Sequence, residues 1–429
     1  MRNENYRFET LQLHAGYTSD KTTGAMAVPI YQTAAYRYET AEDARAEMAL
    51  EKPGYIYSRI ANPTVEILEK RITALERGVA TVCFASGMAA VVAAIQNVTE
   101  SGGEVVAASA LYGGTYTLLF SRFEVRYGIK VIQVDQDDKD SIEDAINEKT
   151  RCIYIETLAN PGMNIPDFEM ISDIAKRNGI PVILDNTFGT PYLFDAKKWG
   201  IDIVIHSLTK YMDGHGNSIG GSVTDLGAFN YKDNVRFKEF NTPDDSYHGI
   251  VYSSLKENAY ITKLRATMMR DTGACLSPFN AFLVLLGLET LSLRMEKHCK
   301  NALILAKYLK GNSSISWVHY PDLPGDKYYE RAGKYLPRGS GGVFTFGIKG
   351  GAEAGKKFVD SLQLIRIVVN LADAKSMVVH PASTTHSQLN EDQLVAAGVP
   401  SDLIRFSAGL EDPDDLIADI EEAIIQSQK

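Results

Sequence analysis

The feature that most constrains this chain is a series of six short apolar runs separated by turns and helical segments. The runs occupy residues 80–85, 104–108, 130–134, 152–155, 181–184 and 201–205. Apolar residues dominate each run instead of alternating with polar ones, which predicts strands that are covered on both faces. Helical stretches such as residues 88–98 and 168–178 lie between the runs. We therefore expect an α/β fold with a mostly parallel central sheet flanked by helices.

The chain has 429 residues, which is too many for one hydrophobic core, and three parts follow one another along it. Residues 1–63 are polar, rich in tyrosine and poor in helical periodicity, so we expect an N-terminal arm instead of a unit with its own core. Residues 64–260 contain the repeated pattern and form the large domain. Residues 261–429 begin with helical character and include a strand-like run at 343–347, which predicts a smaller C-terminal α/β domain.

The charge balance limits the classes of partner. The chain has 44 basic and 54 acidic residues and a net charge of -10. This disfavours nucleic acid or an anionic membrane as the main partner, because both reward clustered Lys and Arg. The longest apolar candidate, residues 281–288, is too short to cross a bilayer, and the N-terminus has no apolar secretory segment.

The cysteines and histidines give no pattern of metal ligands or disulfides. The four cysteines, Cys83, Cys152, Cys275 and Cys299, are scattered without a CxxC pair, which disfavours a disulfide framework and a structural zinc site. His380 and His386 have no third ligand at a suitable spacing, so we expect no metal. We therefore expect a cytoplasmic enzyme or binding protein that acts on a small molecule.

Polar residues follow several of the apolar runs at the point where each run ends. These residues are Ser86, Gly87 and Met88 after the first run, Glu156 and then Asn160 after the fourth, Asp185 and Thr187 after the fifth, and Ser207, Thr209 and Lys210 after the sixth. Ligands of parallel α/β sheets bind beyond the carboxyl ends of the strands. The sequence therefore predicts an acid, a lysine, hydroxyls and a glycine-led helix start on one rim.

One cofactor chemistry uses all of these groups together, namely pyridoxal 5'-phosphate (PLP) held on a lysine as a Schiff base. A carboxylate facing the pyridine nitrogen keeps the nitrogen protonated, so that the ring accepts electrons. Hydroxyls and the amides at a helix N-terminus hold the phosphate, and an aromatic side chain covers the ring. A nucleotide loop is not expected, because the paired glycines lack the GxGxxG and Walker spacings.

Six ordered motifs then identify a family. They are YSRIANPT at residues 57–64, SGMAA at 86–90, YGGT at 112–115, DNT at 185–187, SLTK at 207–210 and RFSAGLE at 405–411. The chain resembles the Cys/Met-metabolism family of PLP enzymes over nearly its whole length, and within that family it is similar to the O-acetylhomoserine sulfhydrylases. The resemblance implies the aminotransferase-like fold (fold type I) of PLP enzymes.

The resemblance assigns the residues around the cofactor ring. Lys210 is similar to the lysine that forms the Schiff base and moves protons during catalysis. Asp185 matches the partner of the pyridine nitrogen, and Thr187 lies close to the ring. Tyr112 is similar to the tyrosine that stacks on the ring and assists proton transfer. Asn160 matches a contact to the 3-oxygen of the ring, although Thr157-Leu158-Ala159 before it departs from the Pro-Ser/Thr of cystathionine enzymes.

The resemblance also assigns the phosphate and substrate contacts. The turn of Ser86, Gly87 and Met88, with the hydroxyls of Ser207 and Thr209, is expected to hold the phosphate. Tyr57 and Arg59 match a pair that reaches the phosphate of a neighbouring subunit, and Tyr57 is also expected to contact the substrate. Arg405 matches the arginine that binds the substrate carboxylate, a task suited to its forked donors. Asn370 is expected beside it.

The activity implied is γ-replacement on O-acetyl-L-homoserine, in which sulfide or another sulfur donor gives L-homocysteine and acetate. The alternatives are a methionine or homocysteine γ-lyase and a cystathionine γ-synthase. Methionine γ-lyases usually carry cysteine at the position of Gly114. The run at residues 370–376 also differs from the Ser-Leu-Gly-Gly of cystathionine enzymes, with Ala372 where glycine is common. The runs at 213–216 and 247–249 likewise favour the sulfhydrylases.

The sequence leaves several points open. They are the acyl group of the substrate (acetyl, succinyl or phospho), the sulfur donor (sulfide, methanethiol or a protein thiocarboxylate) and the balance of replacement against elimination. The resemblance favours an acetyl group and a homotetramer, a dimer of dimers with active sites shared between subunits. A small sulfur-carrier protein is a further candidate partner.

Overall fold

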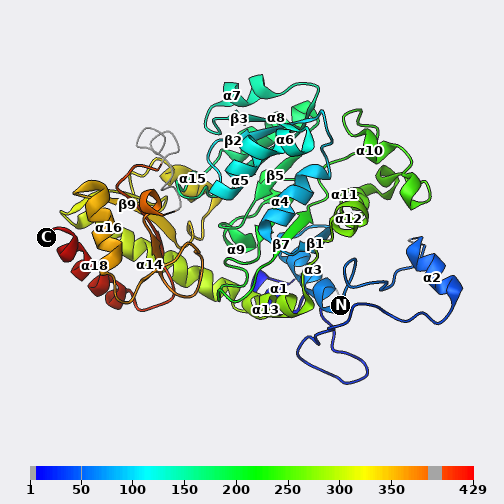
Figure 1. Cartoon of the computed structure of the whole chain (residues 1–429), viewed down its shortest axis with the longest axis horizontal. Coiled ribbons are helices and arrows are strands. Elements are labelled where there is room, and N and C mark those ends of the chain that lie inside the picture. Colours follow the sequence, from blue (N-terminus) through cyan, green and yellow to red (C-terminus); the bar gives the residue numbers. More distant parts are fainter. Residues whose placement is uncertain (1–5, 50, 385–398) are drawn as a thin grey trace.

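A computed structural model describes residues 6–49, 51–384 and 399–429 of the chain and contains two sheets (Figure 1). The larger sheet has seven strands in the order β1-β7-β6-β5-β4-β2-β3. These strands are β1 (Ala80–Phe84), β2 (Glu104–Ala108), β3 (Lys130–Val134), β4 (Thr150–Glu156), β5 (Val182–Asp185), β6 (Ile203–Ser207) and β7 (Gly221–Asp225). The six apolar runs of the sequence are β1 to β6.

The larger sheet is parallel except at one strand. Strands β2 to β6 pair in parallel, whereas β7 is antiparallel to both β1 and β6. Two antiparallel pairings in succession leave β1 running in the same direction as β6. The expectation of a mostly parallel sheet is therefore confirmed, and β7 is the strand that the apolar pattern did not reveal. Its sequence, GSVTD, contains one aliphatic residue, yet the whole strand is buried.

Helices cover this sheet and form a separate lobe beside it (Figure 1). They are α3 (Pro63–Glu76), α4 (Gly87–Gln96), α5 (Gly113–Leu118), α6 (Glu124–Tyr127), α7 (Lys139–Ala145), α8 (Phe168–Asn178), α9 (Thr190–Leu193), α10 (Lys238–Asn241), α11 (Ala259–Lys263), α12 (Arg270–Thr272) and α13 (Pro278–Leu288). Helix α4 packs on β5, β6 and β7, and α3 packs on β1. Residues 226–258 form the lobe around α10.

The smaller sheet has five strands in the order β10-β11-β12-β9-β8. They are β8 (Ile315–His319), β9 (Val343–Ile348), β10 (Arg366–Ile367), β11 (Met377–Val379) and β12 (Leu403–Ser407), and the helices of this part are α14 (Leu291–Gly311), α15 (Tyr329–Tyr335), α16 (Gly351–Ser361) and α18 (Pro413–Ser427). Strands β8, β9, β12 and β11 pair antiparallel in that order. A smaller α/β unit therefore follows the large one.

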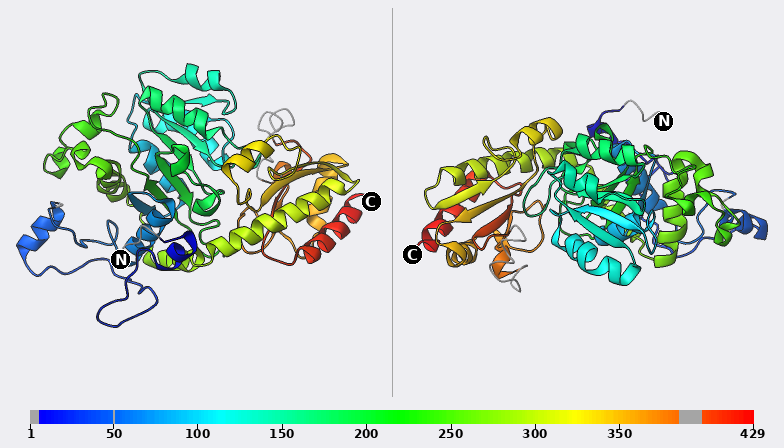
Figure 2. Two further views of the ribbon diagram at one scale, coloured as in Figure 1. Left: turned by 180° about the vertical axis from the view of Figure 1, so that it is seen from behind. Right: turned by 90° about the horizontal axis from the view of Figure 1, so that it is seen from above.

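The long helix α14 joins the two hydrophobic cores, as the views in Figure 2 show. Leu291 and Met295 near its start belong to the core of the large sheet, whereas Ala302 and Leu309 further along belong to the core of the small sheet. Residues 261–288 also pack in the large core. We therefore propose that the C-terminal domain begins within α14, and that residues 261–290, assigned to it from the sequence, belong with the large domain.

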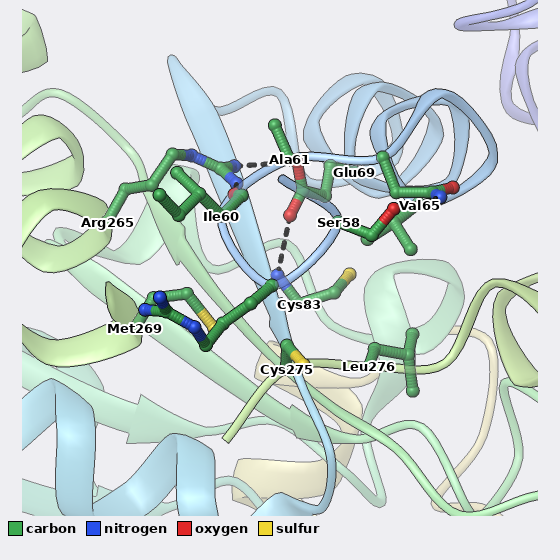
Figure 3. Close-up of a pocket in the computed structure, with 12 residues that line it drawn as sticks. Ser58, Ile60, Ala61, Val65, Glu69, Cys83, Arg265, Met269, Cys275 and Leu276 are labelled. Carbon is green, nitrogen blue, oxygen red and sulfur yellow. Dashed lines mark hydrogen bonds and ion pairs between the residues drawn. The ribbon is translucent and has the colours of Figure 1, made fainter. Parts of the chain in front are cut away.

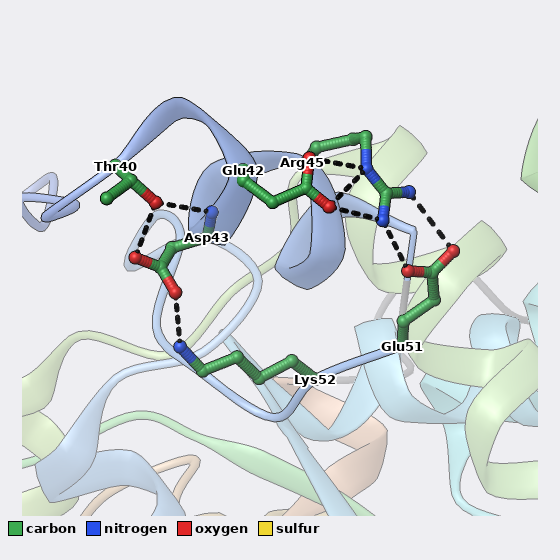
Figure 4. A network of polar contacts seen from close by, with 6 residues as sticks. All are labelled: Thr40, Glu42, Asp43, Arg45, Glu51 and Lys52. Atoms are coloured by element: carbon green, nitrogen blue, oxygen red, sulfur yellow. Dashed lines mark hydrogen bonds and ion pairs between the residues drawn. The ribbon is translucent and has the colours of Figure 1, made fainter.

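The arm contains two short helices. Helix α1 (Phe8–His14) packs on α3 and α14, and the side chain of Gln12 donates to Ser292 Oγ at 3.0 Å. Helix α2 (Ala41–Met48) has no buried residue. Its only ties in Figure 4 are polar: Thr40 caps the helix, and Arg45 lies between Glu42 and Glu51. Exposed ion pairs of this kind contribute little stability, so the chain's own core does not hold α2.

Two sequence expectations concern what the chain does not contain. Among the described residues, no helix is long and apolar enough to cross a membrane. The four cysteines are all free, and three of them are buried.

Candidate active site

Lys210 lies one turn beyond the end of β6, on the rim where the parallel strands of the large sheet end. The Lys210 N–H donates to Ser207 O at 3.1 Å, which folds the chain back at the strand end. The Nζ atom donates to the side-chain oxygen of Asn370, which comes from the smaller domain. Within the described part of the chain, no carboxylate pairs with Lys210. The amine is therefore held by a neutral partner at the junction of the two domains.

The surroundings of Lys210 favour its uncharged form. Burial, with the nearby positive charge of Arg405, lowers the pKa of the Lys210 amine to about 8. A lysine in such a site is a better nucleophile and proton acceptor than an exposed one, because a larger fraction is unprotonated at neutral pH.

Arg405 lies in the middle of β12 and faces the same space. Its Nη1 donates to Asn160 Oδ1 at 3.2 Å, and its Nη2 donates to the carbonyl oxygens of Val369 at 2.9 Å and Asn370 at 3.3 Å. Burial lowers its pKa to about 10, with no carboxylate of the described chain beside it to compensate. An arginine buried without an acid is arranged to receive an anion from outside the chain.

Asp185 ends β5 and faces the same rim. One of its oxygens accepts the Thr187 N–H at 3.0 Å, and Thr187 Oγ1 in turn accepts the Ser207 N–H at 2.8 Å. These two bonds tie the end of β5 to the end of β6. Burial raises the pKa of the Asp185 carboxyl, although the two hydrogen bonds from Thr187 oppose this effect. The acid and Lys210 thus lie on neighbouring strand ends.

The N-terminus of α4 points at the same rim. Ser86 caps the helix by accepting the Ala89 N–H at 3.1 Å, which leaves the N–H groups of Gly87 and Met88 without a partner in the helix. A Cβ atom at Gly87 would lie 2.7 Å from Ser207 Cβ, so the helix start is pressed against the end of β6. Helix amides and the Ser207 hydroxyl therefore gather at one point, as an anion site requires.

Thr209 is the remaining candidate for binding the phosphate, and its hydroxyl already accepts one hydrogen bond. The Gly220 N–H donates to Thr209 Oγ1 at 3.2 Å, which ties the Lys210 turn to the chain before β7. Met88 makes a further contact, because its sulfur lies 3.9 Å from Thr115 Oγ1 in α5.

Tyr112 precedes α5, and its ring is about half exposed. Its N–H donates to Glu156 Oε1 at 2.7 Å, which anchors the start of α5 to the end of β4. Tyr112 also lies near Arg405, since its hydroxyl opposes the lowering of the Arg405 pKa. An aromatic ring on this rim is in place to cover a flat ligand.

Tyr57 and Arg59 lie apart from this rim. Arg59 donates to Arg270 O, its guanidinium stacks on the exposed Tyr57 ring at 5.6 Å, and neither side chain hydrogen-bonds to Lys210, Asp185 or Arg405 within the described residues. The small pocket in Figure 3 shows how this part of the arm is anchored. Arg265 donates to Ile60 O at 2.8 Å and pairs with the buried Glu69.

The residues present fit PLP. The donors at the start of α4 and the Ser207 hydroxyl suit its phosphate, the Asp185 carboxyl suits a protonated pyridine nitrogen, and Lys210 offers an amine without an acidic partner. The close approach of Gly87 to Ser207 leaves no room for a side chain at residue 87. The site is built from both domains, because Asn370 and Arg405 come from the smaller one.

Comparison with known proteins gives the class. The model of the Cys/Met metabolism PLP-dependent enzymes matches residues 9–425, so the chain belongs to this family and PLP is its cofactor. An O-acetyl-L-homoserine sulfhydrylase of Leptospira meyeri is 46% identical over 98% of this chain and 97% of that protein. A homocysteine synthase of Schizosaccharomyces pombe is 45% identical over 98% of this chain and 99% of that protein.

A solved structure supports the same assignment. A crystal structure from Campylobacter jejuni, assigned as an O-acetylhomoserine (thiol)-lyase, has a TM-score of 0.94 and 42% identity to this chain. It covers 98% of this chain and 100% of its own, and it contains a lysine that carries a pyridoxyl monophosphate group. The expected fold type I architecture and the family resemblance are confirmed.

Some polar residues of the site were not assigned a role from the sequence. Glu156 is buried and anchors Tyr112. Its position at the end of a strand was the signal from which this role could have been predicted. His206 lies in β6 beside the strand that ends in Asp185, and its Nε2 lies 2.5 Å from Oε1 of the buried Glu76. No local pattern predicts that pair, because its members are 130 residues apart.

The runs that favoured the sulfhydrylases occupy two different places. The run 213–216 packs against the run 370–376, because the Ala374 N–H donates to Gly214 O at 2.8 Å. The run 247–249 lies in the lobe around α10, where the Tyr247 hydroxyl donates to Ala266 O. The runs 213–216 and 370–376 therefore lie together beside the site. The run 247–249 contacts the lobe instead.

The histidines considered as metal ligands have other partners where they are described. The two ring nitrogens of His380 bond to Ser383 Oγ at 2.9 Å and Ser401 O at 2.8 Å, and His386 lies outside the described residues. Among the described residues, no three His, Cys, Asp or Glu side chains come together in a group that could hold a metal ion.

Proposed function

We propose that this enzyme catalyses γ-replacement on O-acetyl-L-homoserine with sulfide, giving L-homocysteine and acetate. The single observation that carries the proposal is the pairing of a buried amine, Lys210, with a buried arginine, Arg405, at a junction where no acid of the described chain neutralises either. That arrangement suits an amino acid that brings its own carboxylate. The names of the most similar relatives supply the substrate class.

Arg405 binds and orients the amino acid. Its planar fork donates two parallel hydrogen bonds to the two oxygens of a carboxylate. The bonds to Asn160, Val369 and Asn370 fix the guanidinium in place before the substrate arrives. Less conformational freedom is then lost on binding, and the α-carbon is held at a defined distance from Lys210.

Lys210 and Asp185 serve the proton transfers. Bound PLP withdraws electrons from the amino acid, which makes the protons on Cα and Cβ acidic. Lys210, with its lowered pKa, accepts and returns these protons at Nζ. Asp185 supplies the negative charge that keeps the cofactor nitrogen protonated. The bond from Cγ to the acetyl oxygen breaks, acetate leaves with the electron pair, and the sulfur of sulfide forms the new bond to Cγ.

Gly114 favours replacement over the γ-lyase alternative. A Cβ atom at residue 114 would lie 2.6 Å from Cε1 of the Tyr112 ring, so a cysteine there requires the ring to move. In this chain the Tyr112 ring therefore occupies the space that a larger residue would take. We propose that the ring covers the reaction space and limits the access of water, which would otherwise compete with sulfide.

We also propose a homo-oligomer whose active sites are completed by a second copy of the chain, in a tetramer. Tyr57 is 43% exposed, and within the described residues neither its side chain nor that of Arg59 hydrogen-bonds to Lys210 of its own chain. The arm also exposes Met26, Ile30, Tyr31 and Met48. A segment with this much exposed apolar surface and no core of its own is suited to contact another subunit.

A substrate panel tests the activity. Acetyl-, succinyl- and phosphohomoserine are each supplied with sulfide, and acyl-group, ammonia and homocysteine release are measured together. The proposal expects homocysteine and acetate in equal amounts from the acetyl ester. Ammonia without homocysteine would assign a γ-lyase instead, and cystathionine formation from added cysteine would assign a cystathionine synthase. The Lys210→Ala variant, with the same fold, gives the background rate.

The sulfur donor is tested with the same assay. We propose free sulfide. Methanethiol, whose addition at Cγ gives methionine as the product to be measured, and a small protein with a C-terminal thiocarboxylate are compared with sulfide at equal concentration. Faster homocysteine formation from the carrier protein than from sulfide would replace sulfide in the proposal and would identify a protein partner.

A further inference from the structure

Contacts between the domains converge on the loop that carries Asn160. This loop, residues 160–164 and called here the Asn160 loop, follows β4 of the large domain. Its Asn164 donates to the Tyr328 hydroxyl at 2.8 Å, and Asn160 accepts from Arg405. A third contact comes from His319 at the end of β8. His319 and Arg405 belong to strands of the smaller sheet, and Tyr328 precedes α15.

Both ring nitrogens of His319 face oxygen atoms. Nδ1 lies 2.5 Å from Asp326 Oδ2, and Nε2 lies 2.6 Å from the carbonyl oxygen of Gly162. The carbonyl oxygen can only accept a hydrogen bond. The Asp326 carboxylate already accepts the N–H groups of Tyr320 at 3.1 Å and Tyr328 at 2.9 Å, and its side chain is 3% exposed.

The charge state of the pair follows from these contacts. Burial raises the pKa of Asp326, but the hydrogen bonds from His319 and the backbone outweigh burial and hold it below its usual value. The carboxylate is therefore an anion that accepts at both oxygens. A neutral imidazole has only one N–H, so it would leave one of the two oxygens facing a lone pair. Both contacts are satisfied only when the ring carries two protons.

His319 and Arg405 are aligned in the smaller sheet. His319 on β8 and Arg405 on β12 are both register partners of Thr345 on β9, which lies between them. Register partners on adjacent strands project to the same face, and two strand spacings separate the outer pair by about 10 Å. One row of the sheet thus presents two cationic donors to the Asn160 loop, one to Gly162 and one to Asn160.

We propose that His319 is a positioning residue whose doubly protonated ring links Asp326 to the Asn160 loop and fixes this loop relative to Arg405, so that removing either hydrogen bond weakens binding of the substrate carboxylate. The inference rests on the proposed role of Arg405. Without one of the two bonds, the loop loses one of its ties to the sheet row that holds Arg405.

NMR of the holoenzyme labelled with ¹⁵N-histidine tests the charge state, and loss of signals in His319→Gln assigns the ring. We expect two protonated ring nitrogens in the wild-type enzyme. A ring with one proton would overturn the inference. This measurement needs no turnover, so it stands apart from the identity of the substrate.

Kinetics test the positioning role. In His319→Gln we expect the KM for O-acetylhomoserine to rise about tenfold, with kcat and the KM for sulfide unchanged, because one charge-assisted hydrogen bond is lost. In Asp326→Asn, which is the second variant if His319→Gln does not fold, the KM for O-acetylhomoserine should rise in the same way.

Tyr328→Phe is the matched control. It removes a neighbouring contact to the same loop without changing a charge, so we expect a smaller rise in the KM for O-acetylhomoserine than in His319→Gln. An unchanged KM in His319→Gln, with the wild-type ring shown to be protonated, would overturn the positioning role. If the panel identifies a different amino acid as substrate, that amino acid is used and the same outcomes apply.

Discussion

Glu156 and Asp185 are register partners at the carboxyl ends of β4 and β5. Adjacent strands are about 4.8 Å apart, so the carboxyl groups of Glu156 and Asp185 lie close together on the rim. Burial raises the pKa of Glu156 well above its usual value, and the charge of Asp185 raises it further. Two like charges this close are not both ionised in such surroundings. We conclude that Asp185 carries the charge and that Glu156 keeps its proton at neutral pH.

Glu156→Gln should therefore have a small effect on activity. Glutamine keeps a neutral acceptor for the Tyr112 N–H, so we expect kcat/KM within about threefold of wild type, whereas Glu156→Ala loses the bond and should fall about tenfold. Steady-state kinetics at pH 7 check both variants. Because the pKa of Glu156 is raised in the folded state, the wild-type protein loses stability as the pH rises through that pKa. Glu156→Gln should therefore lose less stability than wild type at alkaline pH. A large loss of activity in Glu156→Gln would show that the charge is needed.

Asp185→Asn tests the other member of the pair. An amide cannot supply the negative charge that keeps the cofactor nitrogen protonated, so kcat should fall by about 10²-fold or more. The Thr187 N–H can still donate to the amide oxygen, so the rim should keep its shape. Absorbance of the purified protein and cofactor release on dialysis check that PLP is still bound. Turnover close to wild type would contradict the role given to Asp185.

The lowered pKa of Lys210 predicts how the cofactor-free chain takes up PLP. Only the uncharged amine attacks an aldehyde, so the rate of reconstitution should rise about tenfold per pH unit up to pH 8 and then level off. Arg405→Gln removes a positive charge that lowers the pKa of Lys210, so in this variant the plateau should begin at higher pH. Stopped-flow absorbance measures the rate. The exposed Lys356→Ala serves as control, and a rate that keeps rising to pH 10 would contradict burial of Lys210.

Asp202 predicts a dependence of stability on pH that is separate from catalysis. It lies just before β6, at the end of the strand opposite Lys210, and burial raises its pKa to about 7. Burial raises the pKa of nearby Asp225 to about 7 as well. A raised pKa in the fold favours the neutral acid, so this contribution to stability is full at low pH and is lost as the pH rises through about 7.

Asp202→Asn should remove that loss. Relative to wild type, the free energy of unfolding of the variant should improve by about 2 kcal/mol between pH 5 and pH 8. Thermal unfolding at four pH values measures the difference. Asp173→Asn on the exposed side of α8 is the control, and the same trend in both variants would show that the effect is not specific to Asp202.

The strands were the most predictable part of this fold, and the reason is burial. Strands β1, β2, β4, β5 and β6 are almost wholly buried and read as apolar runs, so they were identified. The edge strand β3 is partly exposed, but its three aliphatic residues were enough to identify it. Strand β7 is equally buried, but Ser222 and Thr224 give it a polar sequence, and Thr224 satisfies its hydroxyl by bonding to Thr81. A buried polar side chain with a distant partner gives no local signal. The break between α13 and α14 likewise has no proline or glycine at residues 289–290.

The site was predictable as far as it depends on strand ends. Asp185, Ser207 and Lys210 follow apolar runs, and the parallel topology brings them together. The proposed role of His319 could not be predicted from the sequence, because it depends on a contact with Gly162, which is 157 residues away in the other domain. Ala372 illustrates an intermediate case. Glycine is common at this position in the family, and the φ angle of 62° explains the preference, since an L-residue is strained there.

The arm predicts that two inactive variants restore each other's activity. Arg59→Ala should lack the arm contribution and Lys210→Ala the catalytic amine, yet a hybrid dimer contains one site with both native residues. If half of the dimers are hybrids, the mixture should recover about a quarter of wild-type activity. Native mass spectrometry confirms exchange of subunits, and activity is assayed before and after mixing. Arg37→Ala, which changes an exposed arm arginine paired with Glu39, should be active without mixing. Complete exchange without recovery would mean that each chain builds its own site, and the exposed Tyr57 and Arg59 would then have no part in catalysis.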